Sequence, residues 1–320
     1  MAFRTRVYAR LSRPLLSPVH TMDVAGLPAL RRRRARVQRS LLASPAVGRP
    51  SPDCHIDDVV APVAGTDLRL RVYRPDDAGP GLPCVVAFHG GGFVLGTPEE
   101  VDWLCSAVSV RTRAVVVSPA YRLAPEHPYP AAVTDAWAAT RWVHRHPDRF
   151  GIDRDRMAVM GESAGGTLAA VVALRARDAG WPGLRMQALL YPAVDLLETF
   201  ESQRRYADGP VLTSAQLDGF SRLYLGGADG SERDASPLRA DDLSGVAPAL
   251  VLTAEHDPLR DHGARYADAL AAAGVPTRHT RYRGAVHGFL ALPGLVPAAR
   301  QALVEIVHEL GTALRPVRSS

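Results

Sequence analysis

The most informative absences in this sequence are those of lysine and asparagine. All 38 basic residues are arginine, and asparagine does not occur among the 320 residues. Without lysine the chain cannot contain a P-loop lysine, a Schiff-base lysine or a Ser–Lys catalytic dyad. Without asparagine it has no N-glycosylation sequon. The simplest origin of both absences is a GC-rich genome.

Cysteine and long apolar runs are also scarce. Cys54, Cys84 and Cys105 are too few for a disulfide framework, and no C-x-x-C pair indicates a zinc site. We therefore expect a reducing, cytoplasmic setting and no metal. No stretch approaches the ~18 apolar residues that cross a bilayer, and the start lacks the apolar core of a secretory signal. Its arginine and serine content also fits an organelle transit peptide, but a GC-rich bacterial origin explains the same composition.

Acidic residues are nearly missing from the start of the chain. Residues 1–50 contain 11 arginines and one acid, Asp23, a balance of +10, whereas residues 51–320 carry −5. The basic character belongs to a head segment on a mildly acidic body, for which we expect no nucleic-acid binding. The run Arg31–Arg34 could bind nucleic acid or anionic lipid, but the solvated face of a helix is the simpler interpretation.

Short apolar runs rich in β-branched residues alternate with helical stretches from about residue 55 onward. Several runs are apolar throughout, which is typical of parallel strands covered on both faces. The predicted strands are His55–Ala61, Asp67–Arg74, Cys84–His89, Ala114–Ser118, Met157–Gly161, Met186–Tyr191, Ala249–Ala254 and Thr277–Tyr282. The predicted helices include Ala131–His144, Ala164–Arg177, Gly263–Ala273 and Val296–Leu314. This alternation predicts an α/β fold with a doubly wound sheet.

Two parts of this pattern are irregular. Only a short turn, Pro62–Thr66, joins the first two strands, so they should pair antiparallel at one edge of the sheet. The stretch Asp195–Pro248 has no convincing strand, and we expect it to form the helical pieces of a lid or cap.

The strongest chemical signal is Gly161-Glu162-Ser163-Ala164-Gly165, between a predicted strand and a predicted helix. This is the pattern of a nucleophile elbow, a sharp turn that exposes a strained serine. Glycines flank the serine because a Cβ there would collide with neighbouring backbone. The helix that follows would point its free N–H groups at the reacting centre. The alternative is a plain strand–turn–helix connection.

A second signal, His89-Gly90-Gly91-Gly92, stands at the end of another predicted strand. Three glycines let the backbone turn its amides toward a ligand. In acyl transfer such amides, joined by that of Ala164, can hold the oxyanion of a tetrahedral intermediate. Phosphate binding is the alternative, but the missing lysine and the spacing argue against a P-loop.

A serine nucleophile needs a base, and the base needs a carboxylate that orients it. After a nucleophile elbow, the acid precedes the histidine along the chain. Asp257 follows a predicted strand at the carboxyl end, where such sheets place their active sites, and Asp261 is the fallback acid. Of the four later histidines, only His287 lies in a loop after a predicted strand, which makes it the expected base.

These segments together resemble the bacterial hormone-sensitive-lipase family of esterases. The resemblance spans about residues 55–315 and is carried by His89–Gly92, Tyr121–Ala132, Gly161–Gly166, Asp257–Asp261 and His287–Phe289. It implies an α/β-hydrolase fold with an eight-stranded, mostly parallel sheet, helices on both faces and a helical cap. It also implies a cap segment at residues 1–50 and a catalytic domain at residues 51–320, of which residues 195–248 contribute to the cap.

The resemblance assigns roles to individual residues. It implies a catalytic triad of Ser163, Asp257 and His287. The oxyanion hole would be formed by the amides of Gly90, Gly91 and Ala164. The supporting residues of the two motifs would be His89, Gly92, Gly161, Glu162 and Gly165. Many family members carry aspartate in place of Glu162, a change that is not expected to abolish activity. Glu126 and His127 would hold the loop beneath the glycines.

The sequence therefore predicts a serine carboxylesterase that hydrolyses short-chain or other small esters through an acyl-enzyme, without a cofactor. An amide or N-acyl hydrolase would use the same residues. A small-molecule receptor of the same fold would lack the catalytic histidine, which is present here. The last predicted strand is an open edge, and family members often dimerise there, so we also expect a homodimer.

Overall fold

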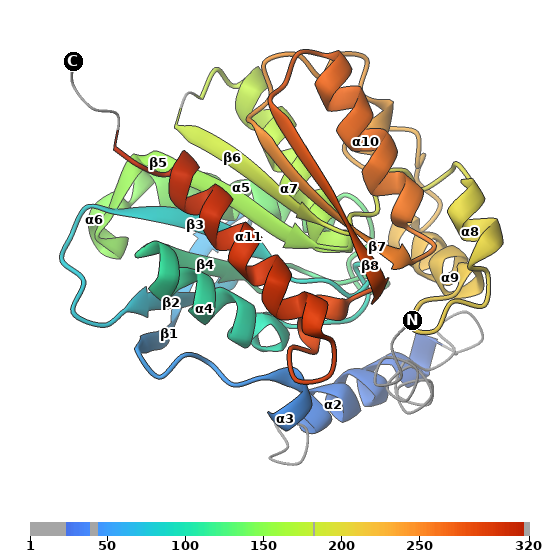
Figure 1. Ribbon diagram of the computed structural model, residues 1–320, viewed down its shortest axis with the longest axis horizontal. Coiled ribbons are helices and arrows are strands. Elements are labelled where there is room, and N and C mark those ends of the chain that lie inside the picture. Colours follow the sequence, from blue (N-terminus) through green and yellow to red (C-terminus); the bar gives the residue numbers. More distant parts are fainter. Residues whose placement is uncertain (1–23, 39–43, 182, 317–320) are drawn as a thin grey trace.

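The computed structural model describes residues 24–38, 44–181 and 183–316. An eight-stranded sheet lies between two layers of helices (Figure 1). The strands are β1 (Cys54–Val63), β2 (Thr66–Pro75), β3 (Leu82–Phe88), β4 (Val115–Pro119), β5 (Ile152–Glu162), β6 (Leu184–Leu190), β7 (Ala249–His256) and β8 (Thr277–Val286). The α-helices are α2 (Leu27–Gln38), α3 (Ser44–Val47), α4 (Asp102–Thr112), α5 (Ala131–Arg145), α6 (Pro147–Phe150), α7 (Ala164–Asp178), α8 (Glu201–Arg205), α9 (Ser214–Leu225), α10 (Arg260–Ala272) and α11 (Pro297–Ala313).

The sheet has the order β1-β2-β4-β3-β5-β6-β7-β8. β1 pairs antiparallel with β2, and β2 pairs antiparallel with β4. Every pair from β4 to β8 is parallel. The predicted antiparallel edge and the mostly parallel α/β sheet are therefore confirmed. Because the parallel strands point the same way, the residues that follow them gather along one edge of the sheet.

Each central strand contributes side chains to both faces of the sheet. Val86 packs in the cluster that includes α5, α7 and α10, whereas its neighbour Val85 packs in the cluster that includes α4 and α11. Val117 and Val116 of β4 divide between the same two clusters. Successive strand side chains point to opposite faces, so a strand buried on both sides must be apolar at every position. This is why the strand runs are apolar throughout.

Among the elements that differ from the sequence prediction, β5 and α4 differ for a clear physical reason. β5 begins at Ile152, five residues before the predicted start at Met157. The early part of β5 reads Asp153-Arg154-Asp155-Arg156 and is partly exposed, so it carries no apolar signal. Helix α4 was not among the predicted helices, because small residues such as Ser106 and Ser109 occupy part of its buried face and blur the apolar stripe.

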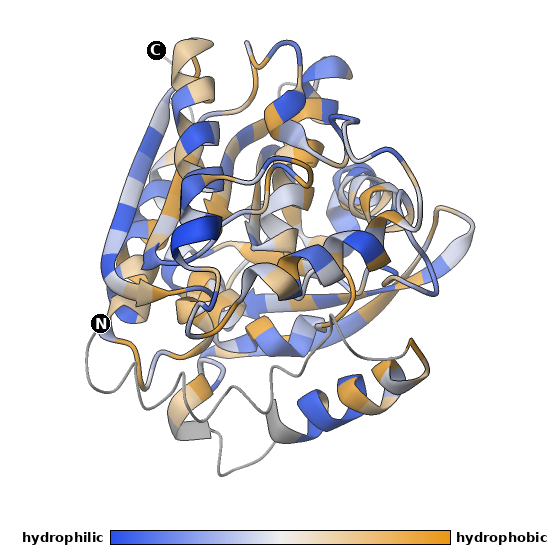
Figure 2. Ribbon diagram, turned by 90° about the vertical axis from the view of Figure 1, so that its right-hand side faces the viewer, coloured by the Kyte–Doolittle hydropathy of each residue, from blue (hydrophilic) through white to orange (hydrophobic). Residues whose placement is uncertain are grey.

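Helices α2 and α3 (blue) and α8 and α9 (yellow) lie outside the two layers that cover the sheet (Figure 1). Leu27 and Leu30 bury one face of α2 against the core, while Arg32 and Arg33 are exposed. Figure 2 shows this hydrophilic run beside the hydrophobic residues of the same helix. The Arg-rich run therefore forms a helix with a solvated face. Residues 1–23 and 39–43 of the expected cap segment lie outside the described residues.

Candidate active site

Ser163 occupies the sharp turn between β5 and α7. Its backbone has φ +53° and ψ −117°, a conformation that non-glycine residues rarely adopt. A Cβ on Gly165 would lie 2.1 Å from the carbonyl oxygen of Phe88, and one on Gly161 would lie 2.0 Å from that of Gly165. Both glycines are therefore required by close backbone approach. The turn places Ser163 at the N-terminus of α7, directly before Ala164.

His287 and Asp257 meet Ser163 because of strand register. His256 and Val286, the last residues of the adjacent strands β7 and β8, pair with each other. Asp257 and His287 directly follow them and therefore leave the sheet side by side. Asp257 is fully buried, and its Oδ2 lies 2.8 Å from His287 Nδ1. His287 Nε2 lies 3.0 Å from Ser163 Oγ. The three predicted residues thus form one continuous chain of hydrogen bonds.

The tautomer of His287 follows from its partners. An ionised carboxylate only accepts hydrogen bonds, so Nδ1 of His287 carries the proton and donates it to Asp257. Nε2 is then free to accept from the Ser163 hydroxyl. Asp257 is itself held in place, because its Oδ1 accepts the backbone N–H of Leu259 at 2.8 Å. The imidazole therefore presents a basic nitrogen to the serine.

The glycine loop after β3 passes beside Ser163. A Cβ on Gly90 would lie 3.5 Å from Ser163 Cβ. Gly91 has φ +121°, and a Cβ there would come within 2.1 Å of the Leu95 carbonyl oxygen. Its own carbonyl accepts the N–H groups of Val94 and Leu95, at 3.2 and 2.8 Å. The loop is thus a tight turn with its backbone beside Ser163, where backbone amides could meet an oxyanion that develops on a bound carbonyl group.

His89 supports this loop from below. Its buried ring stacks on Tyr121 with a centroid separation of 4.2 Å, and Nδ1 donates to the Gly90 carbonyl oxygen at 2.8 Å. The Tyr121 hydroxyl donates to the His89 carbonyl oxygen at 2.8 Å. Burial lowers the pKa of His89, so its ring is neutral at ordinary pH. Its position makes it a support for the backbone, separate from His287.

Glu162 and Tyr191 form a buried polar pair next to Ser163. Tyr191 follows β6, and its hydroxyl donates to Glu162 Oε1 at 2.9 Å. The same ring meets His287 edge-on at a centroid separation of 5.1 Å. Burial raises the pKa of Glu162 to about 7. Tyr191 was missed by the sequence analysis, although its place at the carboxyl end of an apolar strand was a usable signal.

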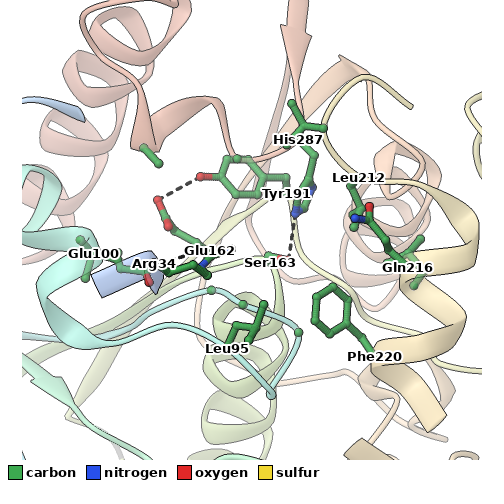
Figure 3. Close-up of a pocket in the computed structure, with 18 residues that line it drawn as sticks. Arg34, Leu95, Glu100, Glu162, Ser163, Tyr191, Leu212, Gln216, Phe220 and His287 are labelled. Atoms are coloured by element: carbon green, nitrogen blue, oxygen red, sulfur yellow. Dashed lines mark hydrogen bonds and ion pairs between the residues drawn. The ribbon is translucent and has the colours of Figure 1, made fainter. Parts of the chain in front are cut away.

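A cavity of about 170 Å³ opens above these residues. Figure 3 shows Ser163 and His287 between two walls. One wall holds Arg34 of α2, Glu100, Glu162 and Tyr191. The other is formed in part by Leu212, Gln216 and Phe220, the last two from α9. The ring of Phe220 also packs against Gly92, where a Cβ would lie 2.4 Å from it. Apart from Glu162, these wall residues were not identified individually from the sequence.

The fallback acid and two of the histidines that were set aside lie elsewhere. Asp261 is in the first turn of α10, where it pairs with Arg260 and accepts the backbone N–H of Ser202 at 2.8 Å. His262 is buried within α10, and His279 of β8 pairs with the hydroxyl of Thr253. Asp257 and His287, rather than these neighbours, form the hydrogen-bonded chain that ends at Ser163.

Comparison with known proteins identifies the family. A model of the alpha/beta hydrolase fold matches residues 85–291. The chain belongs to the alpha/beta hydrolase fold family. This hydrolase is 46% identical over 252 residues to esterase LipI of Mycobacterium tuberculosis, covering 78% of each chain. It is 33% identical over 315 residues to an ethyl acetate hydrolase of Pseudomonas putida, covering 97% of this chain and 96% of that one.

Solved structures give the same family. An esterase of Pyrobaculum calidifontis superposes on this hydrolase with a TM-score of 0.88 at 38% identity. The match covers 98% of this chain and 100% of that one. The predicted hydrolase fold and its esterase family resemblance are therefore confirmed.

Two further properties concern only the part of the hydrolase that the structure describes. Within residues 24–38, 44–181 and 183–316, no helix has both the length and the apolar character needed to cross a bilayer. Within the same ranges, no three His, Cys, Asp or Glu side chains gather closely enough to hold a metal ion.

Proposed function

We propose that this hydrolase is a serine carboxylesterase in which Ser163 is the nucleophile, His287 the base and Asp257 the orienting acid. The observation that carries the proposal is the chain of contacts at 3.0 Å and 2.8 Å that joins these three residues beside the glycine loop. Relatives with the names esterase and ethyl acetate hydrolase support an ester as the substrate.

In the first half of the reaction, Ser163 Oγ attacks the ester carbonyl carbon while His287 Nε2 takes the hydroxyl proton. The carbonyl π electrons move onto oxygen, and the amides of Gly90, Gly91 and Ala164 stabilise that oxyanion. When the tetrahedral intermediate collapses, the C–O bond to the alcohol breaks. His287 returns its proton to the leaving alkoxide, and the acyl group stays on Ser163.

Water completes the cycle by the same route. His287 removes a proton from water as the water oxygen attacks the acyl carbon of the acyl-enzyme. The same backbone amides stabilise the oxyanion of this second tetrahedral intermediate. Ser163 then leaves and regains its proton from His287. In both halves Asp257 holds the imidazole tautomer and stabilises the transient imidazolium. The resting state is restored with one ester hydrolysed to an acid and an alcohol.

We further propose that the head segment and residues 195–248 form the cap of the site. Arg34 of α2 lies in one wall of the cavity, and Gln216 and Phe220 of α9 lie in the other, which supports this division. Helices α2 and α3 of the head and α8 and α9 of residues 195–248 lie outside the sheet and its covering helices (Figure 1). A cavity of about 170 Å³ supports small or short-chain esters as substrates.

Replacement of the nucleophile tests the mechanism. We expect Ser163→Ala to lower kcat on p-nitrophenyl butyrate by a factor on the order of 10⁴–10⁶, because the residual rate comes from the oxyanion hole and binding alone. The matched control is Ser244→Ala, an exposed serine that should retain full activity. A fluorophosphonate probe should label the wild type and Ser244→Ala, and leave Ser163→Ala unlabelled.

Three results would contradict the proposal. Ordinary turnover by Ser163→Ala would remove the serine from the mechanism. Faster cleavage of a matched butyranilide than of the butyrate ester would assign the site to amide hydrolysis. A wild-type protein that neither turns over nor reacts with the probe would be a receptor of this fold.

A further inference from the structure

The proposed oxyanion hole depends on a backbone that is intrinsically loose. Gly90, Gly91 and Gly92 are consecutive, and glycine has more conformational freedom to lose than any other residue. An oxyanion hole works only when its donors are held close to their final positions before the reaction. Something outside the glycine run must therefore hold the turn that ends at Leu95.

Arg31 of α2 makes this contact from outside the sheet. Its Nε donates to the carbonyl oxygen of Val94 at 2.8 Å, and Nη2 donates to that of Ala124 at 2.7 Å. The same guanidinium makes two bonds to the Glu126 carboxylate, at 2.7 and 2.9 Å. Arg31 pairing in turn lowers the pKa of Glu126, which keeps that carboxylate ionised. A single side chain thus connects α2 to two loops of the catalytic domain.

The contact at Val94 leads directly to the glycine run. Val94 accepts from Arg31 through its carbonyl and donates through its N–H to the carbonyl of Gly91, at 3.2 Å. The neighbouring carbonyl of Phe93 accepts the N–H of Ala124, whose own carbonyl is the second acceptor of Arg31. Only one residue, Val94, separates the guanidinium from Gly91 in the hydrogen-bond path.

We propose that Arg31 is a positioning residue for the oxyanion hole, acting through Val94 on Gly91. This inference rests on the proposed esterase function. Glu126 was expected to hold the loop beneath the glycines. In the structure its carboxylate instead binds Arg31 of α2, and Arg31 in turn contacts the turn that follows the glycines. An arginine is needed because its planar fork can donate in several fixed directions at once, which an ammonium group cannot match.

The geometry separates this role from simple stabilisation. The side chains of Arg31 and Glu126 are 23% and 44% exposed, so their ion pair contributes little to the free energy of unfolding. Leu27 and Leu30 supply the apolar contacts that dock α2. Loss of the guanidinium should therefore leave the fold in place and release the turn at Val94.

The test compares Arg31→Ala and Arg31→Lys with Arg32→Ala, an exposed neighbour on the same helix. We expect Arg31→Ala to lower kcat on p-nitrophenyl butyrate about 10- to 100-fold, the scale of a displaced oxyanion donor, with KM changed less than about twofold. Arg31→Lys keeps the charge without the fork and should lose most of the same activity. Arg32→Ala should match the wild type.

A trifluoromethyl ketone provides the readout that a purely structural role would not move. It adds to the nucleophile as a tetrahedral adduct whose oxyanion needs the same amides. Its Ki should rise across the variants by the same factor as kcat falls, while the thermal midpoint of Arg31→Lys stays close to that of the wild type.

Each other outcome overturns the inference. An unchanged kcat in Arg31→Lys, or a raised KM with kcat unchanged, would make Arg31 a contact that only docks α2 on the body. A fall in kcat without a matching rise in the Ki of the ketone would place the effect outside the oxyanion hole. Failure of the esterase function itself is a separate result, because then the wild type would neither hydrolyse the ester nor bind the ketone.

Discussion

At the scale of single residues, Glu162 places a carboxyl group in a buried position next to the nucleophile. Its residue exposure is only 8%, and its side chain accepts a hydrogen bond from the hydroxyl of Tyr191. A neutral donor compensates a buried negative charge only in part, so burial favours the protonated form. The resulting pKa of about 7 lies well above the ordinary value of 4.5 for this side chain.

The raised pKa predicts how stability depends on pH. A group whose pKa is higher in the folded state stabilises the fold below its unfolded pKa, and this contribution disappears as pH rises through the folded pKa. As the pH rises from 4.5 to 7, ionisation of Glu162 should thus lower the free energy of unfolding of the wild type by about 3 kcal/mol. Glu162→Gln, which accepts the Tyr191 bond without a charge, should not show this loss. Urea unfolding of both proteins at pH 4.5, 6 and 8 measures the difference.

Other titrating groups cancel in that comparison, because the two proteins differ at one position. The Glu162→Gln variant should be the more stable protein at pH 8. If the difference in unfolding free energy between the two proteins stayed constant from pH 4.5 to 8, Glu162 would not be buried as a neutral acid.

At the scale of elements, helix α9 shapes the cavity through Phe220. The ring lies against Gly92 and lines the wall opposite Arg34 (Figure 3). The helix is anchored separately, since the ring of Tyr224 stacks on Phe93 at a centroid separation of 3.7 Å. A change at Phe220 should therefore alter the cavity without moving the helix.

We expect Phe220→Ala to shift the substrate preference toward longer chains. Removal of the ring enlarges the wall, and each accommodated methylene contributes apolar contact. The ratio of kcat/KM for p-nitrophenyl octanoate to that for the butyrate should rise about tenfold. Asp218→Ala, an exposed position on α9, is the control and should leave the ratio unchanged. An unchanged ratio in Phe220→Ala would mean that the chain lies along the other wall.

At the scale of the whole molecule, the basic head and the acidic body are joined by ion pairs. Arg31 and Arg34 of α2 pair with Glu126 and Glu100, at 2.7 and 2.9 Å. These basic residues of the head therefore meet acids of the body. The charge of Arg34 in the cavity wall is balanced by Glu100, and Glu162 adds a further negative charge when it ionises.

This balance predicts a preference for neutral esters. At pH 8 the cavity wall holds one arginine and two ionised acids, so a negatively charged acyl group should be repelled. We expect kcat/KM for p-nitrophenyl hemisuccinate to be at least about tenfold below that for the butyrate, which has the same chain length. Added salt should narrow the gap only slightly, because the side chains of Arg34 and Glu100 are 23% and 19% exposed and salt screens shielded charges little. Glu100→Gln should narrow it as well, whereas a preference for the hemisuccinate would show that the head attracts anions.

Much of the fold and the reacting residues could be predicted from the sequence because their signals are local. Strands buried on both faces must be apolar throughout, as Val85 and Val86 are. A strained serine turn needs glycines within two residues, so Gly161 and Gly165 identify Ser163. His287 and Asp257 each follow a strand, and the apolar pattern of the sequence is enough to predict that position.

The remainder was decided by tertiary structure, because it depends on contacts between distant segments. Arg31 and Glu126 are 95 positions apart, and nothing in the run Arg31–Arg34 shows which arginine faces the body and which faces solvent. Phe220 and Gly92 meet only because α9 lies over the glycine loop. The sequence by itself determined the residues on which the proposed chemistry rests, since the serine turn, the histidine after a strand and the glycine turn are each local patterns. The cavity walls and the contact between Arg31 and the glycine loop form only when separate elements pack together, so neither can be predicted from a local pattern.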